Sequence, residues 1–255
     1  MGSGCNLLGY YMYHGGQNPE GKLTTLEENI ATGSLNDMSV KNYDFRAPLG
    51  QYGMPNGTYD EIKLFSMFVH DFSEQIAKTD TYLPAENPLK PENSTDLRTS
   101  WRHYDCQKCG DKRGWVFVNN YQRLVKMDEH KAVVLSSPAE LNAGITFPAV
   151  DVSDRDYFFL PFNMKVGDSV LATSLCTPLC RLDNERKAYV FYSAAAPAGG
   201  ECAAKSSLCS SENAEGKFYQ FAGKASGNED IVTLTREDAL KAHKVVCGSR
   251  QYLII

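Results

Sequence analysis

The chain has 255 residues and a formal net charge of −5, with a sequence pI near 5.6. This length is sufficient for one large or two medium domains with hydrophobic cores. The acidic balance argues against a surface that holds phosphate backbones, so no nucleic-acid partner is expected, whereas neutral sugars stay compatible. The apolar runs are far too short to cross a bilayer, so we expect no membrane partner, and no signal peptide is visible.

An apolar and aromatic run, Leu7 to Tyr13, stops abruptly at His14, Gly15 and Gly16. This pattern predicts a strand that is buried on both faces and ends in a functional loop. A parallel strand of this kind needs neighbours that alternate with helices, and none precede it in the sequence. We therefore expect the chain to be the carboxyl-terminal piece of a longer protein.

A long loop and a helix are predicted next. Residues 23 to 57 are punctuated by Gly, Pro and Asn, and loops of this length are more often functional than decorative. The helix is predicted over residues 58 to 78, with Thr58 and Glu61 as a capping box. One apolar stripe follows at three- and four-residue spacing, made of Ile62, Phe65, Phe68, Val69, Phe72 and Ile76. The stripe is expected to pack on something large.

The second half of the chain changes to the period of strands. Residues 79 to 99 carry three prolines and few apolar side chains, which predicts a linker. Short β-branched or aromatic segments between turn residues then predict an antiparallel sandwich. These segments are residues 114 to 124, 131 to 135, 144 to 152, 157 to 164, 169 to 173 and 187 to 193.

The last sixty residues predict a loop and a further β-rich segment. Residues 194 to 216 are rich in small residues, and Cys202 and Cys209 could pair there in an oxidising compartment. Residues 217 to 234 predict two strands, and residues 235 to 244 a short helix capped by Thr235. A buried strand over 252 to 255 is expected to end the chain.

Two segments resemble a known family of enzymes. Residues 11 to 19, Tyr-Met-Tyr-His-Gly-Gly-Gln-Asn-Pro, resemble the last barrel strand of glycoside hydrolase family 35, the β-galactosidases, with Gln17 in place of the usual Thr. Residues 42 to 49, Asn-Tyr-Asp-Phe-Arg-Ala-Pro-Leu, resemble a Ser-Tyr-Asp-Tyr-Asp-Ala-Pro-Leu segment of that family. Four further segments resemble, in the family's order, the sandwich that follows its barrel. They are residues 117 to 123, 145 to 148, 161 to 163 and 171 to 174.

The resemblance implies a mainly β, α+β chain. It assigns residues 1 to 82 to the last βα unit of a (β/α)8 (TIM) barrel, 83 to 99 to a linker and 100 to 195 to a β-sandwich, with a loop and a further β-rich segment over 196 to 255. The implied activity is retaining hydrolysis of terminal β-galactosides by double displacement, without a cofactor. Both catalytic glutamates of the family lie on earlier strands, upstream of Met1, so the fragment alone is expected to be inactive.

The expected partners follow from the same resemblance. They are a β-linked glycoside substrate, the missing N-terminal barrel and, through the sandwich, a second copy of the chain in a homo-oligomer. For the full-length protein an extracellular or periplasmic location is favoured. Without the barrel, the helix stripe is expected to make the isolated chain aggregate or self-associate.

The resemblance places five residues at the sugar: Tyr11, His14, Tyr43, Asp44 and Phe45. Aromatic rings stack on the apolar faces of pyranoses, and barrel ligands bind at the carboxyl ends of the strands. The alternative is that the tyrosines fill a barrel core and His14 bonds a loop carbonyl. Phe45 stands where the family has a tyrosine whose hydroxyl contacts galactose, which leaves the sugar open. Asp44 is either a supporting carboxylate or a turn aspartate.

Other chemistries stay as alternatives. Residues 16 to 22 have the spacing of a phosphate-binding loop, but Leu23 replaces the Ser or Thr that holds magnesium. Glu27 and Glu28 are predicted to be solvated rather than catalytic. A non-catalytic carbohydrate-binding or structural sandwich module is the second functional hypothesis.

A metal site is a weak further alternative. Cys106 and Cys109 have zinc-knuckle spacing, which supplies half of a site. A disulfide or two free thiols would explain the same pair. The residues that could complete a zinc site are Cys176, Cys180, His103 and His130.

Overall fold

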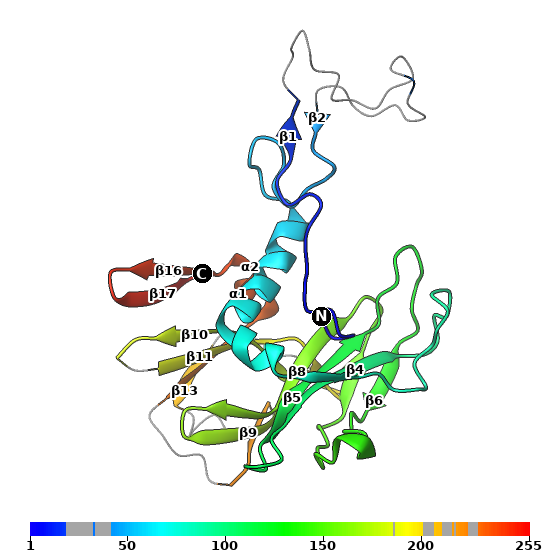
Figure 1. Ribbon diagram of the computed structural model, residues 1–255, viewed down its shortest axis with the longest axis vertical. Helices are drawn as coiled ribbons and strands as arrows, with labels where there is room; N and C mark the ends of the chain where they lie inside the picture. Colours follow the sequence, from blue (N-terminus) through cyan, green and yellow to red (C-terminus); the bar gives the residue numbers. More distant parts are fainter. Residues whose placement is uncertain are drawn as a thin grey trace. The chain divides into compact units, whose positions relative to one another are not determined.

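The computed structural model describes residues 1–18, 33, 42–185, 187–200, 207–210, 216, 218–223 and 229–255, and they form a mainly β structure (Figure 1). The chain divides into two compact units. Unit 1 is Met1–Asn6 together with Met67–Ile255, and unit 2 is Leu7–Ser66. The division differs from the predicted boundary at residue 82, because the second half of helix α1 (Gly57–Ala77) belongs with the strands of unit 1.

The largest sheet of unit 1 has six strands, in the order β14-β9-β8-β5-β4-β3, and every pairing in it is antiparallel. Figure 1 shows β4, β5 and β8 side by side. The bounds are β3 (Asp80–Tyr82), β4 (Arg98–Asp105), β5 (Lys112–Asn119), β8 (Tyr157–Val166), β9 (Ser169–Ser174) and β14 (Tyr219–Phe221). The predicted linker therefore contains β3 and the first residues of β4.

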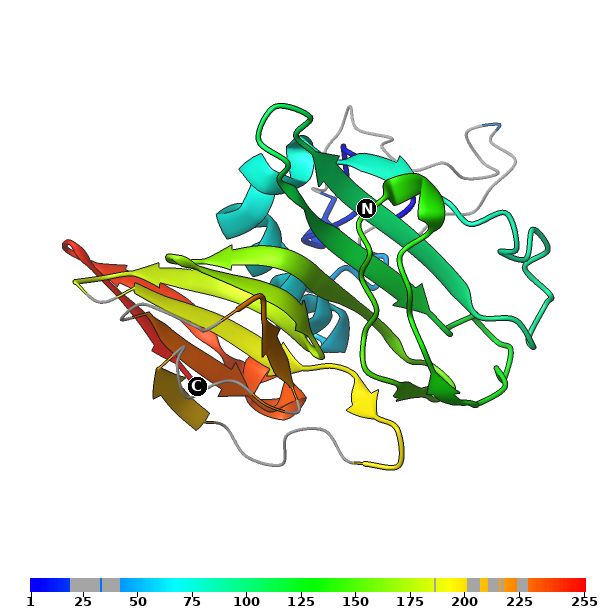
Figure 2. The ribbon, with the colours of Figure 1, turned by 90° about the horizontal axis from the view of Figure 1, so that it is seen from below.

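Three smaller sheets complete unit 1 (Figure 2). The four-stranded sheet has the order β10-β11-β15-β13, formed by β10 (Cys176–Asp183), β11 (Lys187–Ser193), β13 (Ser207–Ser210) and β15 (Asp230–Leu234). The three-stranded sheet has the order β12-β7-β6, formed by β6 (His130–Val133), β7 (Val150–Val152) and β12 (Ala196–Pro197). A hairpin joins β16 (His243–Cys247) to β17 (Arg250–Ile254).

Among the described residues after 195, strands β12, β13, β14 and β15 pair within the larger sheets, and β16 and β17 pair with each other. β15 pairs with β11 in parallel, whereas the other pairs of described strands are antiparallel, as the predicted sandwich requires. The short helices are a 3-10 turn (Ala139–Leu141) and α2 (Arg236–Lys241). The predicted cap of α2 is confirmed, because the Thr235 side chain accepts a hydrogen bond from the Asp238 amide.

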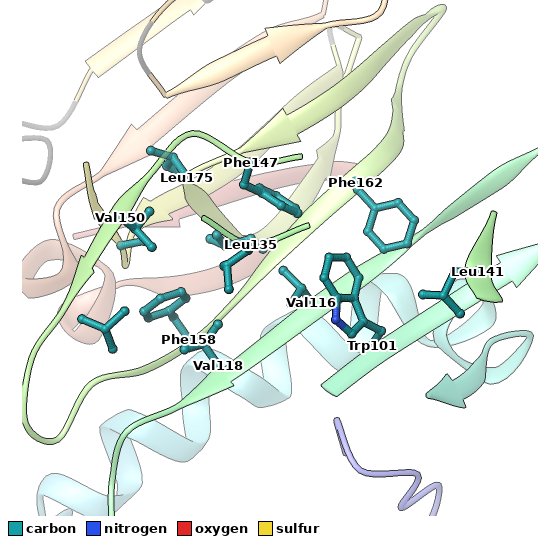
Figure 3. Close-up of a cluster of buried hydrophobic side chains, with 13 residues drawn as sticks. Trp101, Val116, Val118, Leu135, Leu141, Phe147, Val150, Phe158, Phe162 and Leu175 are labelled. Atoms are coloured by element: carbon teal, nitrogen blue, oxygen red, sulfur yellow. The ribbon is translucent and has the colours of Figure 1, made fainter. Parts of the chain in front are cut away.

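One face of the six-stranded sheet carries the main core (Figure 3). Successive side chains of a strand point to opposite faces, so Val116 and Val118 of β5 and Leu160 of β8 lie on this face. They pack with residues from the three-stranded sheet and its connections. The buried members of this cluster from outside the large sheet include Leu135, Leu141, Phe147, Val150, Val152 and Leu175.

The other face of this sheet is covered by the second half of α1. The ring of Phe68 lies 4.4 Å from that of Phe159 and 5.7 Å from that of Trp115, measured between centroids. Phe72 and Ile76 are buried as well. The prediction of an apolar helix stripe is therefore correct, but the expectation that it needs a barrel is wrong for this half, because the sandwich already covers it.

A buried arginine joins the start of the chain to the end of α1. Arg102 of β4 is 1% exposed, and its guanidinium donates to the Met1 carbonyl (3.0 Å), Asn6 Oδ1 (2.8 Å) and Thr79 Oγ1 (2.9 Å). It also donates to the Ile76 carbonyl in the last turn of the helix. A cation at this end of a helix complements its dipole, so Arg102 fixes both segments on the sandwich.

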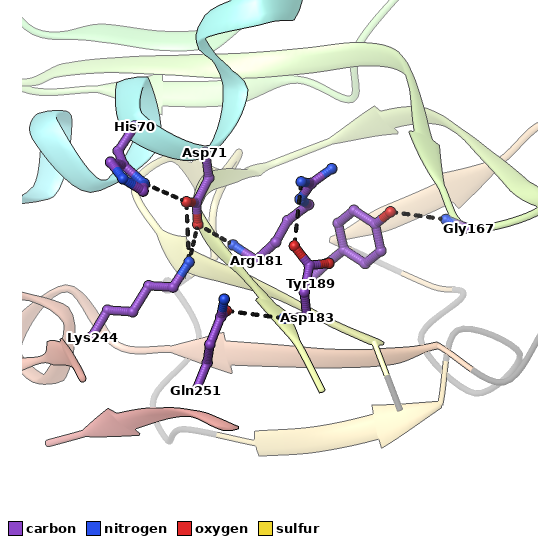
Figure 4. Close-up of polar contacts among 8 residues, drawn as sticks. All are labelled: His70, Asp71, Gly167, Arg181, Asp183, Tyr189, Lys244 and Gln251. Atoms are coloured by element: carbon purple, nitrogen blue, oxygen red, sulfur yellow. Dashed lines mark hydrogen bonds and ion pairs between the residues drawn. The ribbon is translucent and has the colours of Figure 1, made fainter. Parts of the chain in front are cut away.

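A part-buried ion pair joins α1 to the carboxyl-terminal hairpin (Figure 4). The Asp71 carboxylate accepts hydrogen bonds from Lys244 Nζ at 2.8 Å and 3.0 Å, from the Arg181 amide at 2.7 Å and from His70 Nδ1 at 2.7 Å. Burial alone would raise the pKa of Asp71, but these donors outweigh it and hold the pKa below its ordinary value.

Three local predictions are corrected. Leu7 to Tyr13 forms no strand, because no described strand lies beside it to share hydrogen bonds, and Leu7 is 90% exposed. The side chain that caps α1 is Asn56, whose Oδ1 accepts from the Thr58 amide, rather than Thr58 itself. The final strand is an exposed hairpin strand rather than a buried one, since Ile254 is 56% exposed.

Among the described residues, none of the helices combines the length and apolarity that crossing a membrane would require.

Candidate functional site

The two segments that carry the family resemblance lie against each other in unit 2. Strands β1 (Gly16–Gln17) and β2 (Asn42–Tyr43) pair antiparallel. The Gly15 amide donates to the Leu49 carbonyl at 2.7 Å, and the Leu49 amide donates to the Tyr13 carbonyl at 3.0 Å. Backbone hydrogen bonds at both ends of each segment therefore hold the five predicted site residues in one place.

Three of these residues form an aromatic group. The hydroxyls of Tyr11 and Tyr43 are hydrogen-bonded to each other, and the ring of Phe45 lies edge-on to both, at 4.7 Å from Tyr43 and 6.0 Å from Tyr11. Tyr11 is 79% exposed and Phe45 46% exposed. Solvent-facing rings of this kind can stack on the apolar face of a sugar.

Asp44 is held beneath this group by the backbone. Its amide donates to Asn42 Oδ1 and its carbonyl accepts from the Ala47 amide, both at 2.8 Å. A β-carbon on Gly15 would overlap Asp44 Oδ1, so only glycine permits this approach. The Oδ1 atom is buried and has no donor among the described residues. The two backbone contacts are those of a turn residue, which is the alternative role predicted for Asp44.

The turn after Asp44 is strained. Phe45 and Arg46 have positive φ values, 47° and 53°, in the left-handed region that glycine and asparagine favour. Strain of this kind collects at binding sites, where surrounding contacts hold the residue in an unfavourable conformation. It fixes the direction of the Phe45 ring, which is the position that departs from the family.

His14 and Tyr13 lie beside this group but have partners within the loop. His14 Nδ1 hydrogen-bonds the Gly15 carbonyl, which is the alternative role predicted for it. The ring of Tyr13 lies 6.0 Å from that of Tyr10 and 6.4 Å from that of Tyr59. Burial, followed by the nearby Tyr59, raises the pKa of Tyr13 above its ordinary value, so its hydroxyl stays protonated.

The sequence analysis missed two exposed apolar side chains in the same unit. Tyr52 is 79% exposed and Met54 71% exposed, and both lie in a turn in which the Gly50 amide donates to the Met54 carbonyl. Gly53, with φ 77°, permits this turn. The sequence feature that could have indicated this turn is the pair Gly50 and Gly53, two turn-forming glycines on either side of Tyr52.

The other candidate chemistries find less support. Cys106 and Cys109 form a disulfide at the tip of the β4–β5 hairpin, and Cys176 and Cys180 are buried in β10. No group of three or more metal-ligating side chains occurs among the residues that the structure describes. Several predicted features lie outside the residues that the structure describes. They are most of the phosphate-loop segment, Glu27 and Glu28, Cys202 and the side chain of Cys209.

The described residues of the aromatic group have the chemistry to bind a sugar. The site offers aromatic rings and one carboxylate, whereas glycoside hydrolysis needs two carboxylates about 5 Å or more apart across the bond that is cleaved. A scan of the sequence against protein-family models finds no match, and a search among curated proteins finds none either.

Proposed function

We propose that this chain is the carboxyl-terminal portion of a β-galactosidase-like retaining exo-glycosidase. Its unit 2 supplies one wall of the pocket for a terminal β-galactoside, through Tyr11, His14, Tyr43, Asp44 and Phe45. The two catalytic glutamates come from barrel strands that precede residue 1. The reaction is double displacement with retention and uses no cofactor.

The observation that carries the proposal is the pairing of the two resembling segments. They are separated by more than twenty residues of sequence, and they meet through β1, β2 and the hydrogen bonds of Gly15 and Leu49. Two loops that shape one side of a sugar pocket must meet in this way. The exposed rings of Tyr11 and Phe45 then have the chemistry that a pyranose requires.

The segment from Leu7 to Tyr13 supports the proposal that barrel strands precede this chain. Leu7 is 90% exposed, Leu8 48% and Tyr10 41%, although the run from Leu7 to Tyr13 has the composition of a buried strand. Side chains of this kind are normally covered. Preceding barrel strands would both cover them and supply the hydrogen bonds that turn the run into the closing strand.

The sequence upstream of residue 1 gives the first test. The gene is expected to encode further βα units and two glutamates at strand ends before this chain. The full-length product should hydrolyse a nitrophenyl β-galactoside with retained anomeric configuration, followed by NMR, and the 255-residue chain alone should not. A stop codon or unrelated upstream sequence would end the proposal.

Two variants of the full-length protein probe the pocket wall. Tyr11→Ala should lower kcat/KM roughly tenfold to a hundredfold, because a stacking ring is lost. Tyr252→Ala, which truncates an exposed tyrosine of unit 1, is the matched control and should not change it. Phe45→Tyr restores the family's hydroxyl and should increase the preference for galactosides over other nitrophenyl glycosides. Unchanged kinetics in Tyr11→Ala would contradict the assigned wall.

A further inference from the structure

We propose that one end of the sandwich carries a carbohydrate-binding surface of its own, formed by Tyr121, Leu124, Tyr157 and Arg236 and called here the tyrosine platform. All four residues belong to unit 1. The platform is separate from the predicted pocket wall in unit 2 and does not depend on the glycosidase proposal.

A fully buried asparagine builds the support of the platform. Asn120 is 0% exposed and follows β5 directly. Its Nδ2 donates to the carbonyls of Asp128 (2.8 Å) and Ser153 (2.9 Å), and its amide donates to the Asp156 carbonyl at 2.8 Å. The Asn120 side chain thus links two loops, the one that follows β5 and the one that precedes β8.

Two further contacts brace these loops. The Arg155 amide donates to the Asn120 carbonyl at 3.0 Å, and the amide of buried Met127 donates to Asp154 Oδ1 at 2.9 Å. The loops are therefore cross-linked in both directions. A loop pair held in this way presents its exposed side chains in fixed positions, as a preorganised binding site requires.

Both loops also contain strained residues. Leu124 has φ 63° and Arg155 has φ 70°, where L-residues with large side chains are rare. Leu124 is 94% exposed, so burial of its side chain does not compensate the strain. The strained backbone at Leu124 costs conformational energy that its exposed side chain does not offset. Strain of this kind is grounds for inferring a function.

The exposed side chains of the platform have the chemistry of sugar recognition. Tyr121 is 44% exposed and Tyr157 45% exposed, with ring centroids 6.5 Å apart and planes at 66°. The Arg236 guanidinium lies 5.4 Å from the Tyr157 ring and donates to its hydroxyl at 3.3 Å. Two rings at an angle can hold the C–H face and the edge of one pyranose, while the guanidinium donates to its hydroxyls.

Other ligand classes fit less well. The aspartates of the adjoining loop, Asp154 and Asp156, and the net charge of −5 oppose a phosphate backbone. A stable protein partner buries about 800 Å² on each side. Two rings and one guanidinium in mutual contact make a smaller surface, of the kind that binds a sugar. We assign the platform to a neutral oligosaccharide.

Saturation-transfer NMR and titration calorimetry on the 255-residue chain test the assignment. The probes are the tetrasaccharides of β-1,4-linked galactose, xylose and glucose. At least one should bind, and Tyr157→Ala should weaken that binding roughly tenfold or more, which corresponds to about 1.4 kcal/mol. Tyr252→Ala, with the same exposed fraction of 45%, is the matched control and should bind like the unaltered chain.

A second variant, Tyr121→Ala, guards against misfolding of Tyr157→Ala and should weaken binding similarly, with circular dichroism as the folding check. The assignment would be overturned if none of the three sugars bound, or if folded Tyr157→Ala kept full affinity. It would also be overturned if the chain bound a uridine octanucleotide, added as a nucleic-acid probe, more tightly than the sugars. Because no turnover is measured, failure of the glycosidase proposal would leave the result intact.

Discussion

Exposure divides four of the cysteines into two groups with different expected reactivity. Cys5 and Cys247 are exposed, whereas Cys176 and Cys180 are buried in β10. Burial, with the charge of Asp71 nearby, raises the pKa of Cys180 to about 12. The thiolate is the nucleophile, so Cys180 should be inert in the folded chain.

Iodoacetamide labelling at about pH 8, read by peptide mass spectrometry, checks this expectation. Cys5 and Cys247 should be modified in the folded chain, and Cys176 and Cys180 only after addition of urea. Labelling of Cys180 as fast as Cys247 without denaturant would contradict the burial of β10.

Arg102 is the second residue whose environment makes a sharp prediction. Arg102→Met would remove the donors of the Met1 carbonyl, Asn6 Oδ1 and Thr79 Oγ1 together. Thr79 is buried and would lose this donor, whereas Asn6 is exposed and the Met1 carbonyl keeps the Gly4 amide, so the free energy of unfolding in urea should fall by about 1 to 3 kcal/mol.

The controls for Arg102 differ in what they retain. Arg102→Lys keeps the charge but lacks the fork that reaches several acceptors, so it should recover only part of the loss. Arg123→Met removes an exposed arginine and should change the free energy of unfolding by less than about 0.5 kcal/mol. Equal stability of Arg102→Met and the unaltered chain would refute the anchoring role.

Among the elements, the attachment of α1 to the terminal hairpin should respond to pH. The donors around Asp71 hold its pKa below the ordinary value, so their contribution is complete above the unfolded pKa of about 4 and disappears as pH falls through the folded pKa. Asp71→Asn should lower the free energy of unfolding at pH 7 by about 1 to 2 kcal/mol, since Lys244 loses its part-buried charged partner.

Urea unfolding across pH 7 to pH 2.5 measures both effects. The stability difference between the unaltered chain and Asp71→Asn should shrink toward zero at the acid end. The double variant Asp71→Leu with Lys244→Met removes both charges and should be more stable than Asp71→Asn. A difference that is independent of pH would show that the ionised carboxylate is not what joins these elements.

The elements also show how far sequence reasoning reaches. Local signals sufficed for α1 and α2, because an apolar stripe and a capping threonine act within a few residues. Strand β10 was missed because Pro178 and two cysteines obscure its alternation, and β4 because Arg98, Arg102 and His103 make it look polar. The parallel pairing of β11 with β15 depends on tertiary contacts that no local pattern encodes.

The two segments that the motifs single out lie together in the structure, but the detailed arrangement of their side chains could not be predicted from the sequence. Two sequence motifs supplied the candidate residues, which are Tyr11, His14, Tyr43, Asp44 and Phe45. The structure brings the two segments that carry these motifs together. The positive φ of Phe45 and the contact between Asp44 and Gly15 follow from the three-dimensional packing of the loop. The tyrosine platform was missed because its four residues come from three separate segments.

For the whole molecule, the exposed apolar surface of unit 2 predicts association. Because the sandwich covers Phe68, Phe72 and Ile76, the surface that drives it is the segment from Leu7 to Tyr13 rather than the helix stripe. The isolated chain should form oligomers or aggregates in light scattering. Replacing Leu7 and Leu8 by glutamate should reduce them, whereas Leu89→Glu, at a 97% exposed leucine elsewhere, should not. A monodisperse monomer would contradict the prediction.

The anchoring of Met1 and Asn6 by Arg102 also sets a schedule for biosynthesis. Asn6 and Arg102 are 96 positions apart, so at about 5 to 20 residues per second the ribosome takes roughly 5 to 20 s to deliver the arginine after the asparagine. Throughout that interval Asn6 lacks the guanidinium that anchors it in the folded chain. Loop closure over such a span is slow, which makes this contact a late step of folding.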